Sequence, residues 1–189
     1  VKVALCGLGE IGQIHLRAIR ESGHELVGVL ELNRRLAVES VGDEVPIHTE
    51  VMEMVELTEP DVVDICLPHH LHVPIAVAAL EAGADVLLEK PMAIDLAGCD
   101  EIIAAAEAFD HRVGISHNQI HFAPHRRLRE LIDAGRLGQI RAIYERLWMG
   151  GKYGGWREDS SQVGGGLLMD AGVHRVYMAE YLGGPVSTV

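Results

Sequence analysis

A glycine-rich turn near the N-terminus constrains this chain most: residues 7–12 read Gly-Leu-Gly-Glu-Ile-Gly. The turn directly follows an apolar run at Val1–Cys6, which has the composition of a buried strand, and it opens a helical stretch at Ile11–Arg20. A lone Gly-x-Gly-x-x-Gly pattern is a weak signal, because glycines punctuate many loops. Between a strand and a helix, however, it predicts the first unit of an α/β domain that binds a dinucleotide.

Each glycine of this turn has an expected task. Gly7 permits the tight bend, Gly9 lets the backbone approach a pyrophosphate, and Gly12 lets the helix pack closely against the sheet. The pyrophosphate would lie at the helix N-terminus, where free N–H groups and the helix dipole favour an anion. A glycine turn with a purely structural task is the alternative.

Glu31 indicates which dinucleotide the turn binds. It ends the second expected strand, nineteen residues after Gly12, where its carboxylate can accept hydrogen bonds from ribose hydroxyls and repel a 2′-phosphate. The cofactor is therefore predicted to be NAD. Arg34 and Arg35 keep NADP as an alternative, since either could turn toward a 2′-phosphate, although both also suit the solvated first turn of a helix.

Further strand-like apolar runs alternate with helical stretches. They lie at Leu26–Leu30, Val45–His48, Val62–Leu67, Asp85–Leu88 and Arg112–Ser116. This alternation predicts a doubly wound parallel sheet with right-handed crossovers, and the nearly continuous apolar strands indicate helices on both faces. Gly23 and Gly83 are expected to end helices in a left-handed conformation, and Asp95 is expected to cap a helix at Leu96–Phe109.

After residue 120 the pattern changes. The expected elements are a helix at Pro124–Ala134, a strand at Ile140–Met149, a loop at Gly150–Gly166 and a helix at Leu167–Leu182. One strand cannot make a closed domain, because its edges would stay unpaired. We therefore expect a Rossmann domain at residues 1–120, followed at 121–189 by the incomplete start of an α/β domain with an open mixed sheet, and both chain ends to be trimmed.

Composition argues against several function classes. The chain has 16 Lys and Arg against 28 Asp and Glu, a net charge of −12, which repels nucleic acid, and the arginines of Arg126–Arg129 suit a solvated helix face. No apolar run approaches the roughly 18 residues that span a bilayer, and no signal peptide is recognisable. Cys6, Cys66 and Cys99 are expected as buried thiols in a reducing compartment, so a cytoplasmic location is predicted.

Three residues suggest proton and hydride transfer. Lys90 follows an apolar strand, and the carboxyl edge of a parallel sheet borders the ligand crevice, where the ammonium could bind a substrate hydroxyl. Pro91 favours a cis peptide bond that fixes this lysine. Asp170 and His174, four residues apart, share a helix face, and a histidine can take a hydroxyl proton as hydride leaves the carbon. The alternative for Lys90 is a lysine that simply pairs with Glu89. The alternative for Asp170 and His174 is an ordinary pair on a helix surface.

Six other histidines fall into two groups. These are His69, His70 and His72 after a strand, and His117, His121 and His125 at a spacing of four. The second group would need one continuous helix, which Pro124 interrupts. Since a zinc site needs three or four convergent ligands, no metal site is predicted, and polar residues that line a crevice are the preferred interpretation.

Several segments occur together in one known family. They are residues 7–12, Pro68–His72 before an alanine-rich helix, Ala82–Pro91 with its Glu-Lys-Pro end, Trp156–Arg157 and Gly164–His174. In these segments the chain resembles, along essentially its whole length, the glucose-fructose oxidoreductase and inositol dehydrogenase (Gfo/Idh/MocA) family. The Glu-Lys-Pro turn with the late Asp-x-Gly-x-His is more specific than the glycine motif. The resemblance implies a Rossmann domain, a C-terminal α/β domain often used for oligomerisation, and reversible oxidation of a sugar, cyclitol or derivative.

The resemblance also implies residue roles. His174 would be the acid/base, Lys90 would position the hydroxyl, Asp170 would anchor the substrate or the histidine, and Asn118 and Trp156 would be secondary substrate contacts. The residues expected to contact the cofactor are Gly7, Gly9, Glu10, Ile11, Gly12, Glu31, Pro68, His69, His72, Glu89 and Lys90.

Two residues depart from the family pattern. His69 stands where an asparagine is common, and Tyr177 stands where an aspartate often follows the histidine. The predicted function is an NAD(P)-dependent dehydrogenase that acts on a CH–OH group of a polyhydroxylated small molecule and forms a homo-oligomer through its C-terminal sheet. The alternative is a non-catalytic dinucleotide-sensing regulator, which would need only the glycine turn.

Overall fold

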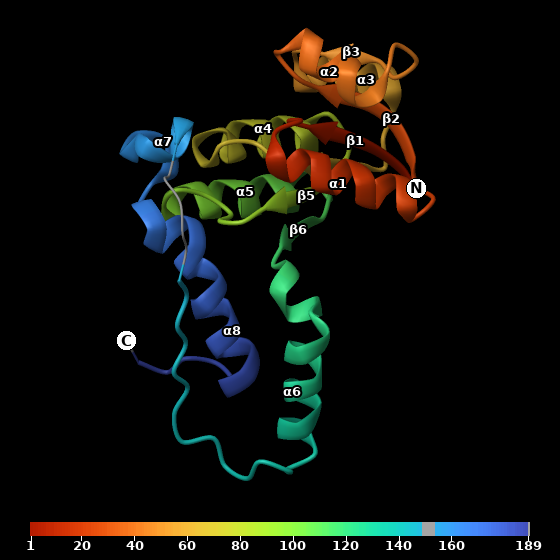
Figure 1. Cartoon of the computed structure of the whole chain (residues 1–189). Coiled ribbons are helices and arrows are strands. Elements are labelled where there is room, and N and C mark those ends of the chain that lie inside the picture. The colour runs from red at the N-terminus through yellow and green to blue at the C-terminus, as the bar shows by residue number, and fades with distance from the viewer. Residues whose placement is uncertain (149–153, 189) are drawn as a thin grey trace.

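The chain forms a six-stranded parallel sheet in the order β3-β2-β1-β4-β5-β6 (Figure 1). The computed structural model describes residues 1–148 and 154–188. The strands are β1 (Lys2–Cys6), β2 (Glu25–Leu30), β3 (Ile47–His48), β4 (Val62–Ile65), β5 (Asp85–Glu89) and β6 (Val113–Ser116). This order confirms the predicted doubly wound fold, and it reverses direction between β1 and β4.

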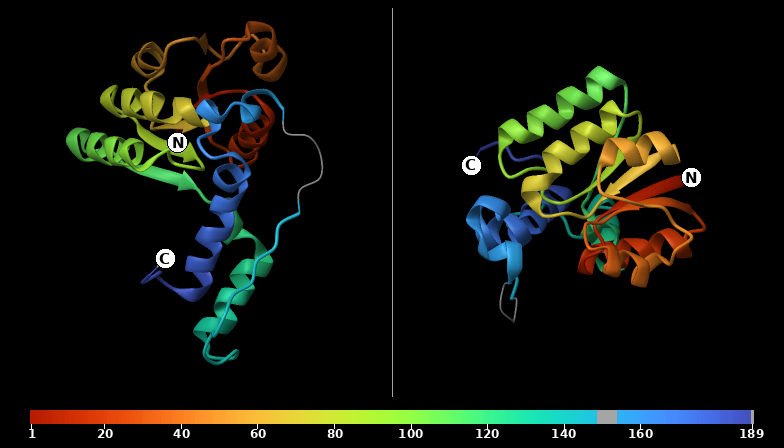
Figure 2. Two further views of the ribbon diagram at one scale, coloured as in Figure 1. Left: turned by 90° about the vertical axis from the view of Figure 1, so that its left-hand side faces the viewer. Right: turned by 90° about the horizontal axis from the view of Figure 1, so that it is seen from above.

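Helices cover both faces of the sheet, as the apolar strands require (Figure 2). They are α1 (Glu10–Glu21), α2 (Arg34–Val41), α3 (Val51–Thr58), α4 (His72–Glu81) and α5 (Leu96–Phe109). One core cluster joins α1 and α2 to side chains such as Leu5 and Val29, and the other joins α3, α4 and α5 to side chains such as Ile65 and Leu88. The helix ends were predicted correctly at Gly23 and Gly83, which have positive φ, and at Asp95, whose carboxylate accepts from Gly98 N.

The strand register brings the ends of four strands to one edge. Cys6 pairs with Ile65, Ile65 pairs with Leu88, and Glu89 pairs with Ser116. The residues that follow these positions therefore gather at the carboxyl edge, where the glycine turn begins α1. Cys6 is buried there as predicted, whereas Cys66 and Cys99 are only half-buried, and all three thiols are free.

The second part of the chain extends away from the sheet (Figure 1). It contains 3-10 helices at Asn118–His121 and Gly155–Glu158, α6 (Ala123–Asp133), α7 (Ser160–Val163), a π-helical turn at Leu168–Gly172 and α8 (Val173–Gly183). Arg129 Nη1 donates to the Tyr181 carbonyl at 2.6 Å, which joins α6 to α8. Within the described residues, no helix is long and apolar enough to cross a membrane.

Two expectations for this part were wrong. The predicted strand at Ile140–Met149 is irregular through residue 148, with Met149 outside the described residues, because no neighbouring strand in the described chain pairs with it. The predicted loop at Gly150–Gly166 contains two short helical segments within its described part, from residue 154, and Asp159 caps α7 by accepting from Ser161 N. The predicted helix at Leu167–Leu182 is confirmed, although it opens with a π-helical turn before it continues as α8.

Candidate cofactor and substrate site

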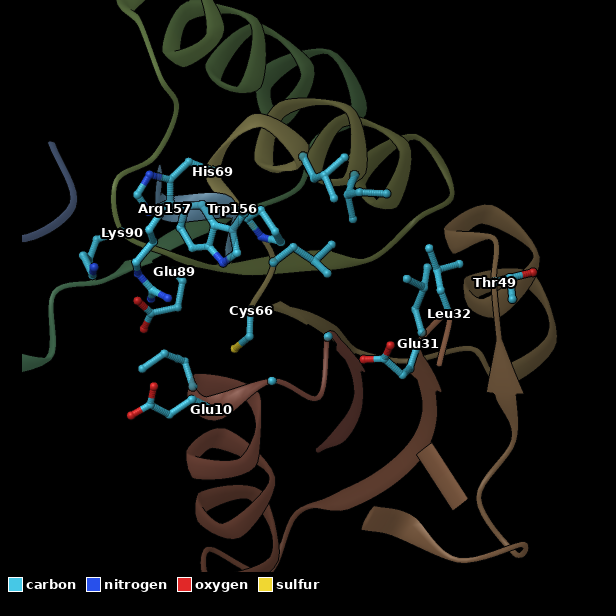
Figure 3. Close-up of a pocket in the computed structure, with 18 residues that line it drawn as sticks. Glu10, Glu31, Leu32, Thr49, Cys66, His69, Glu89, Lys90, Trp156 and Arg157 are labelled. Atoms are coloured by element: carbon cyan, nitrogen blue, oxygen red, sulfur yellow. The ribbon is translucent and has the colours of Figure 1, made fainter. Parts of the chain in front are cut away.

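A cavity of about 520 Å³ opens at the carboxyl edge of the sheet, where the strand order reverses (Figure 3). Ligands of open α/β sheets bind at such reversal points. Nine of the residues expected to contact the cofactor line this cavity: Gly7, Gly9, Glu10, Ile11, Glu31, Pro68, His69, Glu89 and Lys90. The cavity therefore coincides with most of the predicted dinucleotide site.

The glycine turn fits a bound pyrophosphate. Gly7 has φ of +87°, and a Cβ there would lie 2.5 Å from the Cys66 carbonyl oxygen. A Cβ on Gly12 would lie 2.0 Å from the Gly7 carbonyl oxygen, so this glycine serves the packing of α1 under the turn rather than the ligand contact expected of it. A Cβ on Gly9 would meet no atom within 4 Å. The space over Gly9 is thus open to a phosphate, beside the uncapped N-terminus of α1.

Glu31 is held rigidly at the cavity. Its Oε2 accepts from Leu8 N at 3.0 Å and its Oε1 accepts from Asn33 N at 2.9 Å. Each carboxylate oxygen retains a further lone pair for a ribose hydroxyl. Arg35 is one of the two arginines that left NADP as an alternative cofactor. It pairs with Glu39 on the surface, and its side chain is 88% exposed. This geometry favours NAD over NADP.

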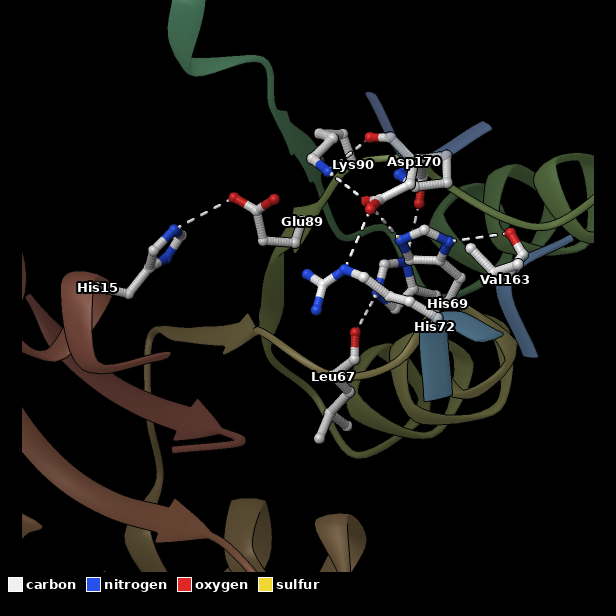
Figure 4. Close-up of polar contacts among 10 residues, drawn as sticks. His15, Leu67, His69, His72, Glu89, Lys90, Val163 and Asp170 are labelled. Atoms are coloured by element: carbon white, nitrogen blue, oxygen red, sulfur yellow. Dashed lines mark hydrogen bonds and ion pairs between the residues drawn. The ribbon is translucent and has the colours of Figure 1, made fainter. Parts of the chain in front are cut away.

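Lys90 connects the Rossmann sheet to the second part of the chain. The Lys90–Pro91 peptide bond is cis, as predicted. The Lys90 ammonium lies at the cavity wall and donates to the Asp170 carbonyl at 2.8 Å and to Asp170 Oδ1 at 3.1 Å (Figure 4). The edge of the sheet and the π-helical turn are thereby joined at the site.

Asp170 is the centre of a buried polar network. His69 Nε2 lies 3.6 Å from its Oδ1, and Arg157 Nε donates to its Oδ2 at 3.0 Å. Contact with His69 and the charges of Lys90 and Arg157 lower the pKa of Asp170 far below its ordinary value, although burial opposes this. In the described part of the chain, no hydrogen bond joins Asp170 to His174. Asp170 therefore contacts Lys90 and His69 in this structure, and its expected role as an anchor of the substrate or of His174 stays a prediction.

His174 is the second residue of α8, two residues after the π-helical turn ends at Gly172. Burial, followed by the positive charge of Lys90, lowers the pKa of His174 to about 4. The imidazole is therefore neutral at neutral pH and can accept a proton.

Two other histidines differ in their relation to the cavity. His72 was expected to contact the cofactor, but it is entirely buried, with Nδ1 2.8 Å from the Pro91 carbonyl and Nε2 2.9 Å from the Leu67 carbonyl. It ties the start of α4 to the chain on either side of the site. His69 lines the cavity, and its Nδ1 lies 3.1 Å from the Val163 carbonyl.

Trp156 and Asn118, the expected substrate contacts, differ in position. Trp156 lines the cavity, packs edge-on against His69 at 4.6 Å and carries the Arg157 guanidinium 4.5 Å above its ring. Asn118 begins the 3-10 helix that follows β6. For both residues the contact with a substrate stays a prediction.

Two family models cover this chain. The model described as "Oxidoreductase family, NAD-binding Rossmann fold" matches residues 1–117, and the model described as "GFO/IDH/MocA C-terminal domain" matches residues 125–189. The chain belongs to the GFO/IDH/MocA oxidoreductase family. Its N-terminal part therefore carries the NAD-binding Rossmann fold that the glycine turn and sheet order indicate.

Individual relatives are similar over part of their length. The 1,5-anhydro-D-fructose reductase of Ensifer adhaerens is 32% identical over 83% of this chain and 48% of its own length. Inositol 2-dehydrogenase 1 of Saccharopolyspora erythraea is 31% identical over 73% of this chain and 43% of its own length. The chain spans about half the length of the curated relatives it matches.

Solved structures agree with the fold. The aldose-aldose oxidoreductase from Caulobacter crescentus, complexed with glycerol, is 26% identical with a TM-score of 0.84 over 97% of this chain and 58% of that chain. The WlbA dehydrogenase from Thermus thermophilus, in complex with NAD and alpha-ketoglutarate, is 27% identical with a TM-score of 0.80 over 100% of this chain and 64% of that chain.

Sequence reasoning missed two features of this family member's site. Arg157 holds Asp170 from thirteen residues away, and no spacing rule connects them. His15 lies on α1 between Asp64 and Glu89, with its ring nitrogens 2.9 Å and 3.3 Å from their oxygens. Neither signal is visible in a local pattern, because each partner comes from a different element.

Proposed function

We propose that this chain forms the cofactor-binding and catalytic part of an NAD(P)-dependent dehydrogenase, with NAD preferred, that oxidises a secondary hydroxyl of a sugar, cyclitol or related small molecule. The contact of Lys90 with Asp170 carries this proposal, because it holds an ammonium that can bind a hydroxyl at the wall of the dinucleotide cavity, and Asp170 lies four residues before His174. A dinucleotide sensor would need the cavity alone. The relatives named anhydrofructose reductase and inositol dehydrogenase support the substrate class.

Each of these residues would have a separate role in such a reaction. The Lys90 ammonium, held by Asp170, orients the substrate hydroxyl, and neutral His174 takes its proton as the C–O bond becomes a carbonyl. When bound, NAD supplies the acceptor for the hydride that leaves the same carbon. Gly9 and the N-terminus of α1 would hold its pyrophosphate, and Glu31 its ribose. Trp156 forms part of one wall of the cavity.

The same proposal includes the organisation of the molecule. Residues 1–120 form the cofactor domain and residues 121–189 belong to the substrate and oligomerisation domain of a cytoplasmic homo-oligomer. Exposed apolar side chains after residue 136, such as Tyr144 and Trp148, support a partner surface there. Sedimentation velocity measures the oligomeric state.

A substrate screen tests the activity. The purified chain and the complete product of its gene are each mixed with NAD or NADP and a panel of inositols, aldoses and anhydro sugars, and cofactor reduction is followed by absorbance. We expect reduction with at least one polyhydroxylated substrate, and its loss in His174→Ala with NAD binding retained. Tight NAD binding without turnover on any substrate would instead favour the sensor.

A further inference from the structure

His15 is half-buried between the carboxylates of Asp64 and Glu89, and Figure 4 shows its contact with Glu89. Its Nδ1 lies 2.9 Å from Asp64 Oδ2, and its Nε2 lies 3.3 Å from Glu89 Oε1. Asp64 belongs to β4 and is 3% exposed, and Glu89 ends β5 and is 7% exposed. One ring thus joins the cofactor helix α1 to two strands at their carboxyl ends.

The environment keeps this ring charged. Burial by itself would lower the pKa of His15, but contacts with Asp64, Cys66 and Glu89 raise it to about 12. Glu89 keeps a lowered pKa, because its contacts with His15 and Ser116 and the charge of Lys90 outweigh the effect of burial. The ring is an imidazolium that donates from both nitrogens.

Other titratable groups around the cluster do not supply a competing charge near neutral pH. Burial raises the pKa of Cys6 on β1, and it also raises that of Cys66, after β4, to about 11, so both thiols stay protonated. Burial lowers the pKa of His117, after β6, so this ring is neutral, and Lys90 is held by Asp170. Of the cationic groups around the cluster, His15 contacts both carboxylates, and the charge of Lys90 adds to the neutralisation of Glu89.

We propose that His15 is a positioning residue for hydride transfer, which holds Glu89 and the adjacent Lys90 in register with the N-terminal turn of the cofactor helix. Lys90 follows Glu89 directly, so fixing the Glu89 carboxylate to α1 also fixes where the lysine side chain starts. The pyrophosphate end of α1 begins at Glu10, little more than one turn before His15. This inference rests on the proposed dehydrogenase function.

A bound metal is the competing explanation. One ligand atom each from His15, Asp64 and Cys66 lies within 4.8 Å of the others. The hydrogen-bond distance between His15 and Asp64 and the protonated Cys66 thiol favour the ion pair, because zinc binds the thiolate. Zinc analysis of the purified protein decides between them.

The first arm of the test is an NMR titration of the histidine rings, which requires no turnover. The His15 signals are assigned from their loss in His15→Gln, and exposed His24 serves as the internal control. We expect His15 to stay protonated from about pH 5 to about pH 9. Titration of His15 below pH 8, or stoichiometric zinc that disappears in His15→Gln, would overturn the inference.

The second arm measures catalysis. His15→Gln leaves two buried carboxylates without a cation, so one takes up a proton in the neutral range, and kcat should fall roughly tenfold and gain a new pH dependence. His15→Gln combined with Asp64→Asn should lose that pH dependence while kcat stays low. His15→Lys, which keeps the charge, should recover most of kcat even where the glutamine variant folds poorly, and His24→Gln should change nothing.

The arms separate the two proposals. An active protein whose His15→Gln variant keeps kcat and an unchanged pH profile would remove the positioning role alone. A protein that binds NAD without turnover on any substrate would remove the proposed function and the positioning role with it.

Discussion

The Lys90 ammonium lies 2.8 Å from the backbone oxygen and 3.1 Å from the carboxylate of Asp170, although 80 residues separate them. This contact makes one site from the sheet edge and the π-helical turn. It also places a buried lysine against a buried carboxylate, where truncation of one partner leaves the other uncompensated. The substitutions below follow from this arrangement.

Lys90→Ala and His174→Ala should each lower turnover by roughly a hundredfold or more in the protein that contains this chain, because each removes one group that we propose contacts the reacting hydroxyl. Their double variant should lose less than the product of the single effects. Steady-state kinetics with calorimetric NAD binding checks this, and NAD affinity should be nearly unchanged. A fully active His174→Ala protein would contradict the assignment.

Glu31→Ala should weaken NAD binding by about 1 to 2 kcal/mol, because a charge-assisted contact to the ribose is lost. NADP binding should weaken less, since the repulsion of a 2′-phosphate disappears with the carboxylate. Calorimetric titration with both dinucleotides measures the change, and Arg35→Ala is the matched surface control. Tighter NADP binding by the unchanged protein would reverse the cofactor assignment.

Gly12→Ala and Gly9→Ala should have different effects: the first should lower stability, and the second should lower NAD affinity. The new Cβ at Gly12 would lie 2.0 Å from a backbone oxygen, so thermal unfolding should show a loss of stability of about 2 kcal/mol or more. The new Cβ at Gly9 meets no protein atom, so stability should change by less than about 1 kcal/mol. NAD affinity should nevertheless fall about tenfold, or 1.4 kcal/mol. An equal loss of stability in the two variants would argue against an open space over Gly9.

The lowered pKa of His174 predicts that both stability and kcat/KM decrease at acidic pH. The folded state binds this proton only near pH 4, whereas the unfolded chain binds it near pH 6.5, so the group stabilises the fold above pH 6.5 and loses that contribution as pH falls toward 4. Likewise kcat/KM should fall only as pH approaches 4 to 5. Urea unfolding at several pH values measures the first effect, and His174→Gln should flatten it.

The fold and the glycine turn could be predicted because their causes are local. Apolar runs of strand length, Gly7 at a bend and Asp95 at a helix start depend on residues a few positions away. Lys90 could be predicted for a related reason, since parallel strands deliver their following residues to one edge.

The remaining features depend on contacts between distant elements. No local sequence pattern indicates that the His72 ring contacts two backbone carbonyls rather than a cofactor. Likewise, no local pattern indicates that Arg157 pairs with Asp170. The alternating pattern at 140–149 resembles a strand, but pairing needs a neighbour that the described chain does not place beside it. The sequence by itself therefore determined the sheet and the glycine turn, and it supplied the candidates for the reacting groups. Only the tertiary structure decided which residue contacts each of these side chains. The reason is that a buried polar or charged group pairs with the groups that the fold places next to it, and these come from distant parts of the sequence.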